Sequence, residues 1–320
     1  MNKTKSTQDT KKTNDQEKKS LIAPNTIIKL IIPKEEVEQA YKKALKKLAK
    51  KIKVDGFRKG NVPTKIAEEN INANQIIEEA LQLTVPEIYT KEIKKLEKQP
   101  LTYPEFNPVS LEKGKDWVVE AHIAERPKIK LNKYQEVVKK AQKEAVKEIA
   151  KQAEEHIKTV HKNEKDGAES THKHEEPTEA EKNNFTLQFI YQELIKELKP
   201  EIQELLVKEE VRYDLDNLAH RLKDMNIPFE KFLEHRKMTF EQLSTELAAG
   251  ALSRLQASFI INEIAIEQKI SVTAKDLDAE FDKIKDEKLR MQQKTDRRYV
   301  DMMSQTILRE KVADHLLSIK

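Results

Sequence analysis

Gly-Phe-Arg-Lys-Gly-Asn-Val-Pro, residues 56–63, is the stretch of this chain that decides its fold. This octet joins two strongly helical stretches. An ordinary helix–helix loop would use its glycines for positive φ angles and its proline to start the next helix. Such a loop does not account for Phe57 beside the cations Arg58 and Lys59, because aromatic residues and arginine together are typical of binding hot spots. We therefore predict that the octet is a docking loop.

The helix expected before the octet carries a face of lysines. Residues 34–53 place apolar side chains in alternating steps of three and one, which is the spacing of one helical face. Residues 34–65 hold ten Lys and one Arg against three Glu and one Asp, a local excess of seven positive charges. A solvated surface explains this face by itself. Beside a docking loop it also suits a phosphate-rich partner, and Lys43, Lys46, Lys47 and Lys50 are the supporting residues.

The surrounding segments predict a small α+β domain over residues 21–127, after a disordered tail at residues 1–20 that is too polar to bury much surface. Strand-like runs occupy Thr26–Ile32 and Asp116–Ile123, and an extended, proline-rich segment occupies Leu101–Leu111. Between them, a helical stretch runs from about Thr64 to Lys98. We expect Pro86 to kink or restart this helix.

The rest of the chain predicts a predominantly α-helical, elongated domain over residues 184–320. Residues 128–183 precede it as a linker, a charged helix at Tyr134–Lys162 and a polar, flexible loop at residues 163–182. Pro200 separates two helices, and Thr239 opens a capping box for a helix that reaches about Gln268. The last helices are expected from Thr273 to about Lys294 and over Arg297–Ile319.

Composition excludes several classes of function. Charged residues are 36% of the chain and only five residues are glycine, which suits long solvated helices. Without cysteine there are no disulfides, no thiol catalysis and no zinc sites with Cys ligands. Residues 1–20 do not resemble a secretory signal, and no apolar run is long enough to span a membrane. We therefore expect a soluble cytoplasmic protein that does not associate with membranes.

The octet resembles the ribosome-docking loop of bacterial trigger factors, whose pattern is Gly-Phe-Arg-x-Gly-x-x-Pro. Gly56, Phe57, Arg58, Gly60 and Pro63 all match this pattern. Asn61 departs from it, because a basic residue is common there, and this change would weaken docking slightly. Residues 200–281 resemble the C-terminal helical domain of the same family. Together the two stretches cover roughly two-thirds of the chain.

The resemblance implies an ATP-independent chaperone for nascent chains. It implies that the N-terminal domain docks beside the exit tunnel of the large ribosomal subunit, on an exit-tunnel protein and ribosomal RNA. The helical domain would then hold nascent or unfolded polypeptides on its inner surface. By this analogy Phe57 inserts against the partner, and Arg58 and Lys59 pair with acidic groups or phosphate. A weak homodimer remains open.

The chain departs from the family where an FKBP-like prolyl isomerase is usually inserted. Residues 135–184 contain no Phe, Tyr or Trp, whereas such a pocket is lined by aromatic residues. We therefore expect no isomerase domain, no enzymatic activity, no catalytic residues and no cofactor. A metal site is also not expected, since His156, His161, His172 and His174 match no standard ligand spacing.

A cradle for clients requires exposed apolar side chains on the helical domain. Core packing explains any one apolar residue at helical spacing, but methionine adapts well to varied partners. The candidates for client binding are Phe229, Phe232, Met238, Phe240, Met302 and Met303. Two other functions stay open, namely a prolyl isomerase, as in full-length relatives, and a helical RNA-binding or scaffold protein.

Overall fold

A computed structural model describes the backbone of residues 21–164 and 178–320. The expected disordered tail, at residues 1–20, and most of the expected polar loop lie outside the described residues. The side chains of residues 153–177 lie outside them as well, and these include the four histidines considered above.

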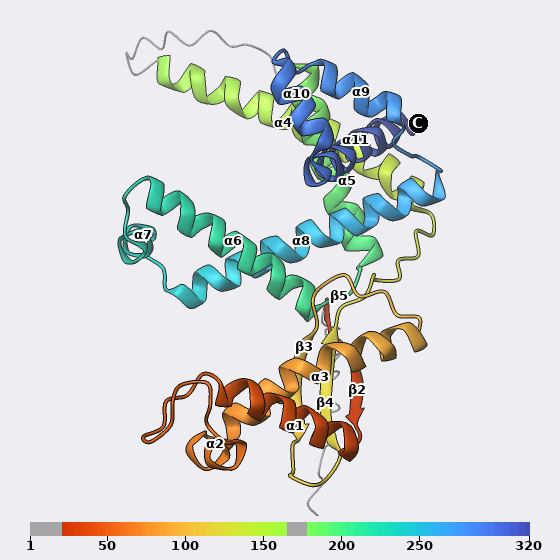
Figure 1. Cartoon of the computed structure of the whole chain (residues 1–320). Coiled ribbons are helices and arrows are strands. Elements are labelled where there is room, and N and C mark those ends of the chain that lie inside the picture. Colours follow the sequence, from red (N-terminus) through yellow and green to blue (C-terminus); the bar gives the residue numbers. More distant parts are fainter. Residues whose placement is uncertain (1–20, 165–177) are drawn as a thin grey trace, which may run out of the picture.

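The N-terminal part is a three-stranded antiparallel sheet covered on one face by helices (Figure 1). The strands β2 (Thr26–Ile32), β3 (Glu105–Ser110) and β4 (Trp117–Ile123) lie in the order β2-β4-β3. Buried residues alternate with exposed ones along β2 and with half-buried ones along β4, so one face of the sheet enters the core and the other lies toward solvent. The helices are α1 (Lys34–Ala49), α2 (Thr64–Asn70) and α3 (Ala73–Lys95).

The C-terminal part consists of helices. They are α4 (Tyr134–Glu164), α5 (Glu179–Leu198), α6 (Glu204–Asp224), α7 (Phe229–Arg236), α8 (Phe240–Glu267), α9 (Ala274–Asp282), α10 (Glu287–Thr295) and α11 (Arg297–Ser318). Buried side chains of α4, α5, α8 and α11 form one core, which we call the body; it includes Tyr134, Leu194, Ile264 and Val312. No helix within the described ranges is long and apolar enough to cross a membrane.

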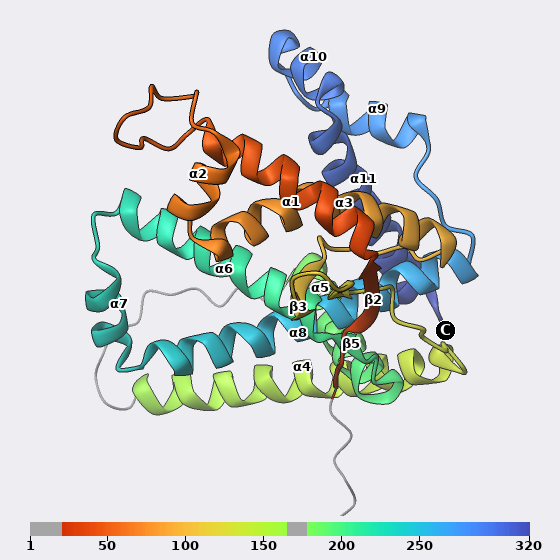
Figure 2. The same ribbon diagram turned by 60° about the horizontal axis from the view of Figure 1, so that its bottom comes forward.

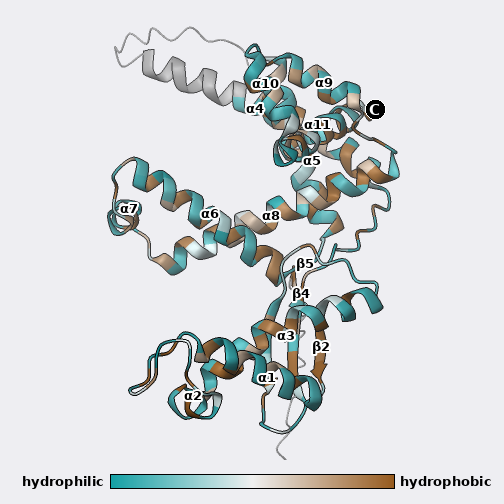
Figure 3. Cartoon of the chain, in the orientation of Figure 1, coloured by the Kyte–Doolittle hydropathy of each residue, from teal (hydrophilic) through white to brown (hydrophobic). Residues whose placement is uncertain are grey.

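Two groups of helices project from the body. Helices α6, α7 and the first half of α8 form the first arm, which Figure 1 shows extending away from the body. Helices α9 and α10 and the start of α11 form the second arm, which Figure 2 shows projecting in another direction. Hydrophobic residues concentrate along β2 and on parts of α3 and α8, whereas much of the helical surface is hydrophilic (Figure 3). The expected α+β part followed by an elongated helical part is confirmed.

Three sequence-based helix boundaries are wrong. The helical stretch after the octet breaks at Ile71 and Asn72, where the Asn72 side chain caps α3, and Pro86 lies inside the continuous α3 instead of restarting it. The helix expected from Thr273 to Lys294 is two helices, because the Asp286 side chain accepts hydrogen bonds from two backbone N–H groups and starts α10. Helix α5 also begins earlier than expected, at Glu179, after a capping box on Thr178.

A pair of two-residue strands was not predicted from the sequence. Strand β1 (Ile22–Ala23) pairs in parallel with β5 (Ile202–Gln203), which directly precedes α6. Because β1 leads into the N-terminal sheet and β5 leads into the first arm, this pairing joins the two parts of the chain.

The Asp276 carboxylate links α9 to α11, which gives a prediction about pH. Asp276 accepts from the Lys311 Nζ at 2.6 Å and also caps α9 at Thr273, and these bonds lower its pKa to about 2. The ionised carboxylate makes these bonds, so its contribution to stability is complete above the ordinary pKa of 3.8. That contribution is lost as the pH falls through about 2. We expect Asp276→Asn to lower the melting temperature nearly equally between pH 7 and pH 4, and to have a much smaller effect as the pH falls through about 2. A difference that disappears already at pH 5 would contradict this assignment.

Candidate functional site

The octet forms a projecting loop between α1 and α2 (Figures 1 and 2). Two successive turns shape it, since the Phe57 N–H donates to the Val54 carbonyl at 3.1 Å and the Asn61 N–H donates to the Arg58 carbonyl at 3.0 Å. Gly56 and Gly60 have φ angles of 87° and 92°. These angles are in the left-handed region, which residues with a side chain rarely adopt. The glycines therefore fix the shape of the loop.

The base of the octet is anchored and its tip is exposed. Val62 is buried in the N-terminal core, and Val54 packs against the same core. Phe57 is 37% exposed, and Arg58 and Lys59 are both exposed. An aromatic ring outside the core, held beside two exposed cations on an anchored loop, is arranged to contact a partner.

Substitution of Gly60 tests the contribution of the backbone conformation of the loop without changing its packing. A Cβ atom added at Gly60 would meet nothing within 4 Å, so Gly60→Ala, which adds that atom alone, imposes only backbone strain, of about 1–2 kcal/mol. We expect this loss in denaturant unfolding of the N-terminal part. Gly250→Ala is the matched control, because Gly250 lies inside α8 without a positive φ and the added Cβ would be 3.4 Å from the Arg254 side chain. The control should gain about 0.5–1 kcal/mol. Equal losses of stability in both variants would refute the conclusion that Gly60 is required for its positive φ angle.

The four supporting lysines of α1 are not equivalent. Lys43, Lys46 and Lys50 are exposed and have no ion pair among the residues that the structure describes. Lys47 instead forms an ion pair with Glu79, whose side chain on α3 is largely buried. Lys47 thus fastens α1 to α3, and the other three lysines present free charge next to the octet. Sequence spacing gave no sign of the partner of Lys47.

Four of the six client-binding candidates lie at the tip of the first arm. Phe229 lies with its ring centroid 6.3 Å from that of Phe232 and 6.2 Å from that of Phe240. Phe240 is 54% exposed, and Met238 is half-buried just before α8. The rings therefore form a partly exposed aromatic cluster instead of a closed core.

An open groove of about 830 Å³ runs beside this cluster between α6, α7 and α8. Its apolar lining includes the exposed Met225 and Ile227, which sequence reasoning missed although they flank the expected turn at Asn226. Charged residues of both signs also line the groove, among them Asp214, Arg221, Arg236 and Arg254. An apolar surface with a charged rim suits an amphipathic polypeptide segment.

Met302 and Met303 lie elsewhere, on α11 in the second arm. Met302 is 56% exposed and Met303 is half-buried. The six candidates therefore do not form one continuous surface. Among the described side chains, no group of three metal-binding residue types could hold a metal ion.

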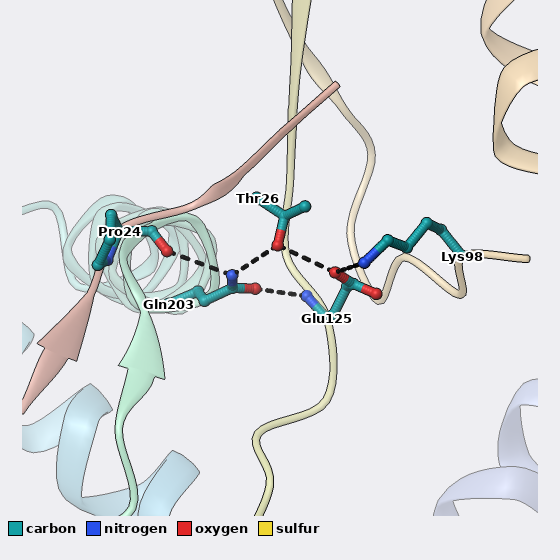
Figure 4. Close-up of polar contacts among 5 residues, drawn as sticks. All are labelled: Pro24, Thr26, Lys98, Glu125 and Gln203. Carbon is teal, nitrogen blue, oxygen red and sulfur yellow. Dashed lines mark hydrogen bonds and ion pairs between the residues drawn. The ribbon is translucent and has the colours of Figure 1, made fainter. Parts of the chain in front are cut away.

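The junction between the two parts is a network of hydrogen bonds centred on Gln203 (Figure 4). The Gln203 side chain accepts from the Glu125 N–H at 2.5 Å, and it donates to the Pro24 carbonyl at 3.2 Å and the Thr26 hydroxyl at 3.0 Å. Thr26 and Lys98 both donate to the Glu125 carboxylate at 2.9 Å, and the Lys98 hydrogen bond is the main reason why the pKa of Glu125 is lowered. The network therefore helps to fix where the octet lies relative to the arms, together with the β1–β5 pairing.

Comparison with known proteins assigns both parts of the chain to one family. Residues 14–160 match the model of the bacterial trigger factor protein family, and residues 164–318 match the model of the trigger factor C-terminus. The chain belongs to the bacterial trigger factor family. The two matched regions adjoin, without an FKBP-like domain between them.

Curated trigger factors match a shorter part of the chain. The trigger factor of Staphylococcus epidermidis is 37% identical over 108 residues, and that of Staphylococcus saprophyticus is 35% identical over the same length. Each match covers 34% of this chain and spans only 25% of the relative.

A solved trigger factor chaperone, described for promiscuous substrate recognition in folding and assembly, matches 92% of this chain and 97% of its own. Its TM-score is 0.56 and its identity is 14%, so this likeness shows the trigger factor fold.

Proposed function

We propose that this chain is a ribosome-associated chaperone that holds nascent or unfolded polypeptides without ATP. The observation that carries the proposal is the anchored octet with its exposed Phe57, Arg58 and Lys59. Residues 21–127 would be the docking part, residues 184–320 the chaperone part, and residues 128–183 the connection between them. The partner for docking would be the large ribosomal subunit in the cytoplasm, at a protein and the RNA near the exit tunnel.

Clients would bind the aromatic cluster and the groove of the first arm. This surface offers exposed apolar side chains beside charges of both signs, so it can accept many sequences. Met302 on the second arm would add a separate contact. The same exposed apolar side chains would support a weak homodimer.

Client holding has a direct test. Light scattering of a chemically denatured, reduced and carboxymethylated protein should stay low when this chain is added in stoichiometric excess without ATP. Phe229→Ser with Phe240→Ser should weaken this suppression severalfold, because the change removes two partly exposed rings. Unchanged suppression in the double variant would place client binding elsewhere, and no suppression by the unmodified chain would refute the chaperone proposal.

We also propose that the chain lacks prolyl isomerase activity. The position usually taken by the isomerase domain holds helix α4, which packs against α5, and the intervening residues contain no aromatic side chain. Without such side chains these residues cannot line an aromatic pocket of the kind that would bind the substrate proline. A refolding assay limited by proline isomerisation should show no acceleration. Acceleration comparable to that of an FKBP would overturn this proposal.

A further inference from the structure

The two edges of the N-terminal sheet differ in their capacity to pair with another strand. Strand β3 forms one edge, and it carries Pro108 and an irregular register between Pro108 and Ser110. Proline and bulges are features that protect an edge strand from pairing with other chains. Strand β2 forms the other edge, with seven residues in unbroken register against β4 and no proline.

The outer side of β2 is unpaired in the part of the chain that the structure describes. Its only strand neighbour there is β4, and Figure 1 shows β2 at the margin of the sheet. Alternate residues of such a strand direct N–H and C=O groups away from the sheet, where they can pair with an extended segment. The edge is therefore a template for one more strand.

The solvent-facing side chains of β2 define the sequence that would fit. Ile27 and Ile31 are each 55% exposed, and Lys29 is exposed between them. Isolated exposed isoleucines are common, but here two lie on one face of an open edge strand. An added strand would place its own side chains beside these three, so apolar residues would suit Ile27 and Ile31 and an acidic residue would suit Lys29.

We propose that the outer edge of β2 is a docking site for unfolded polypeptide, which adds to the sheet as an extended strand with an apolar–acidic–apolar face. This inference rests on the proposed chaperone function and adds a second mode of client binding on the docking part. Strand β2 continues through Pro33 into α1, a helix of sixteen residues that leads to the octet. The site lies about 24 Å, the length of that helix, from the end of α1 that begins the loop.

The test uses amide hydrogen exchange of the full chain with the blocked heptapeptide Thr-Val-Thr-Glu-Thr-Val-Thr as the probe. We expect the peptide to slow exchange about tenfold or more at alternate residues of β2. The same peptide with alternate backbone amides N-methylated should give no protection, because it cannot pair. A peptide with lysine in place of the glutamate should bind more weakly. Equal protection by the N-methylated peptide, or none in β2, would overturn the inference.

Two variants test whether the side chains of β2 determine which peptide it binds. Ile27→Thr with Ile31→Thr keeps a β-branched side chain at each position and should weaken binding of the peptide about tenfold. Val109→Thr is the matched control, because Val109 is 57% exposed on the protected edge strand β3. Peptide binding that falls equally in both variants would contradict a site at β2.

Three further outcomes separate this inference from its alternatives. Protection of β2 that rises with protein concentration and needs no peptide would show pairing between two copies of the chain, and would overturn the assignment to clients. If β2 stays unprotected while the chain still suppresses aggregation, the inference fails and the proposed function stands. If suppression is absent as well, the proposed function fails too.

Discussion

Replacing Phe57, Arg58 and Lys59 together with alanine is expected to abolish co-sedimentation with large ribosomal subunits. The three side chains are exposed on an anchored loop, so their removal leaves the fold intact and takes away the contact surface. If two of them act as hot spots of about 2 kcal/mol each, the affinity falls about a thousand-fold. Pelleting of ribosomes through sucrose, with the bound fraction measured over a range of concentrations, gives this value.

A matched control removes one aromatic residue and two cations from a surface outside the octet. Tyr103, Lys91 and Lys94 are exposed, and the two lysines lie near the end of α3, far from the octet. Replacing these three with alanine also removes one aromatic ring and two cations, and it should leave pelleting unchanged. A loss equal to that of the octet variant would show that general charge, and not the octet, drives binding.

The lysines of α1 should act differently from the octet. Replacing Lys43, Lys46 and Lys50 removes three free charges beside the loop, so binding should weaken moderately and depend less on salt. Lys47 should be kept in this variant, because its ion pair with Glu79 fastens α1 to α3.

Gln203→Ala is expected to loosen the junction between the docking part and the helical part. The substitution removes three hydrogen bonds and leaves the Glu125 N–H without its side-chain partner. Leaving such a partly buried group unsatisfied costs about 1–3 kcal/mol. Single-molecule energy transfer between labels on α2 and α7 should show a broader distance distribution than in the unmodified chain.

Gln142→Ala serves as the control for this change. The Gln142 side chain also donates to two backbone carbonyls, those of Leu316 and Leu317, but it does so within the helical part. It should lower stability without broadening the distance between the labels. An unchanged distribution in Gln203→Ala would contradict this role of Gln203 and would show that the other contacts, among them the β1–β5 pairing and the Arg126–Glu263 ion pair, hold the junction.

The sequence predicts helices and strands well where apolar residues recur periodically or where a capping residue marks the start of a helix. The alternation of β2 and β4, the lysine face of α1 and the capping boxes at Thr239 and Thr273 are all readable in this way. The break at Asp286 could have been recognised, since aspartate is a strong N-cap residue. Of the two effects expected of Pro86, the restart of the helix is wrong, because α3 runs through this residue with the buried Val85 and Ile88 around it.

Contacts between distant segments could not be predicted from one sequence. Ile22 and Ala23 are too few to show a strand pattern, and their partners lie almost two hundred residues further on. The same is true of the ion pair between Lys47 and Glu79 and of the groove on the first arm, which three separate helices build. Periodicity shows which face of an element is apolar, but it does not show which element covers that face.

The junction has a consequence for the order in which this protein itself is made. Pro24 and Gln203 are separated by 179 positions in the chain. At about 5–20 residues per second, the ribosome needs roughly 9–36 seconds between them. The N-terminal sheet and its helices close within the first 123 residues, so they can fold during this interval without the junction. The newly made octet is therefore complete before its orientation is fixed, and translation itself delays the assembly of the whole molecule.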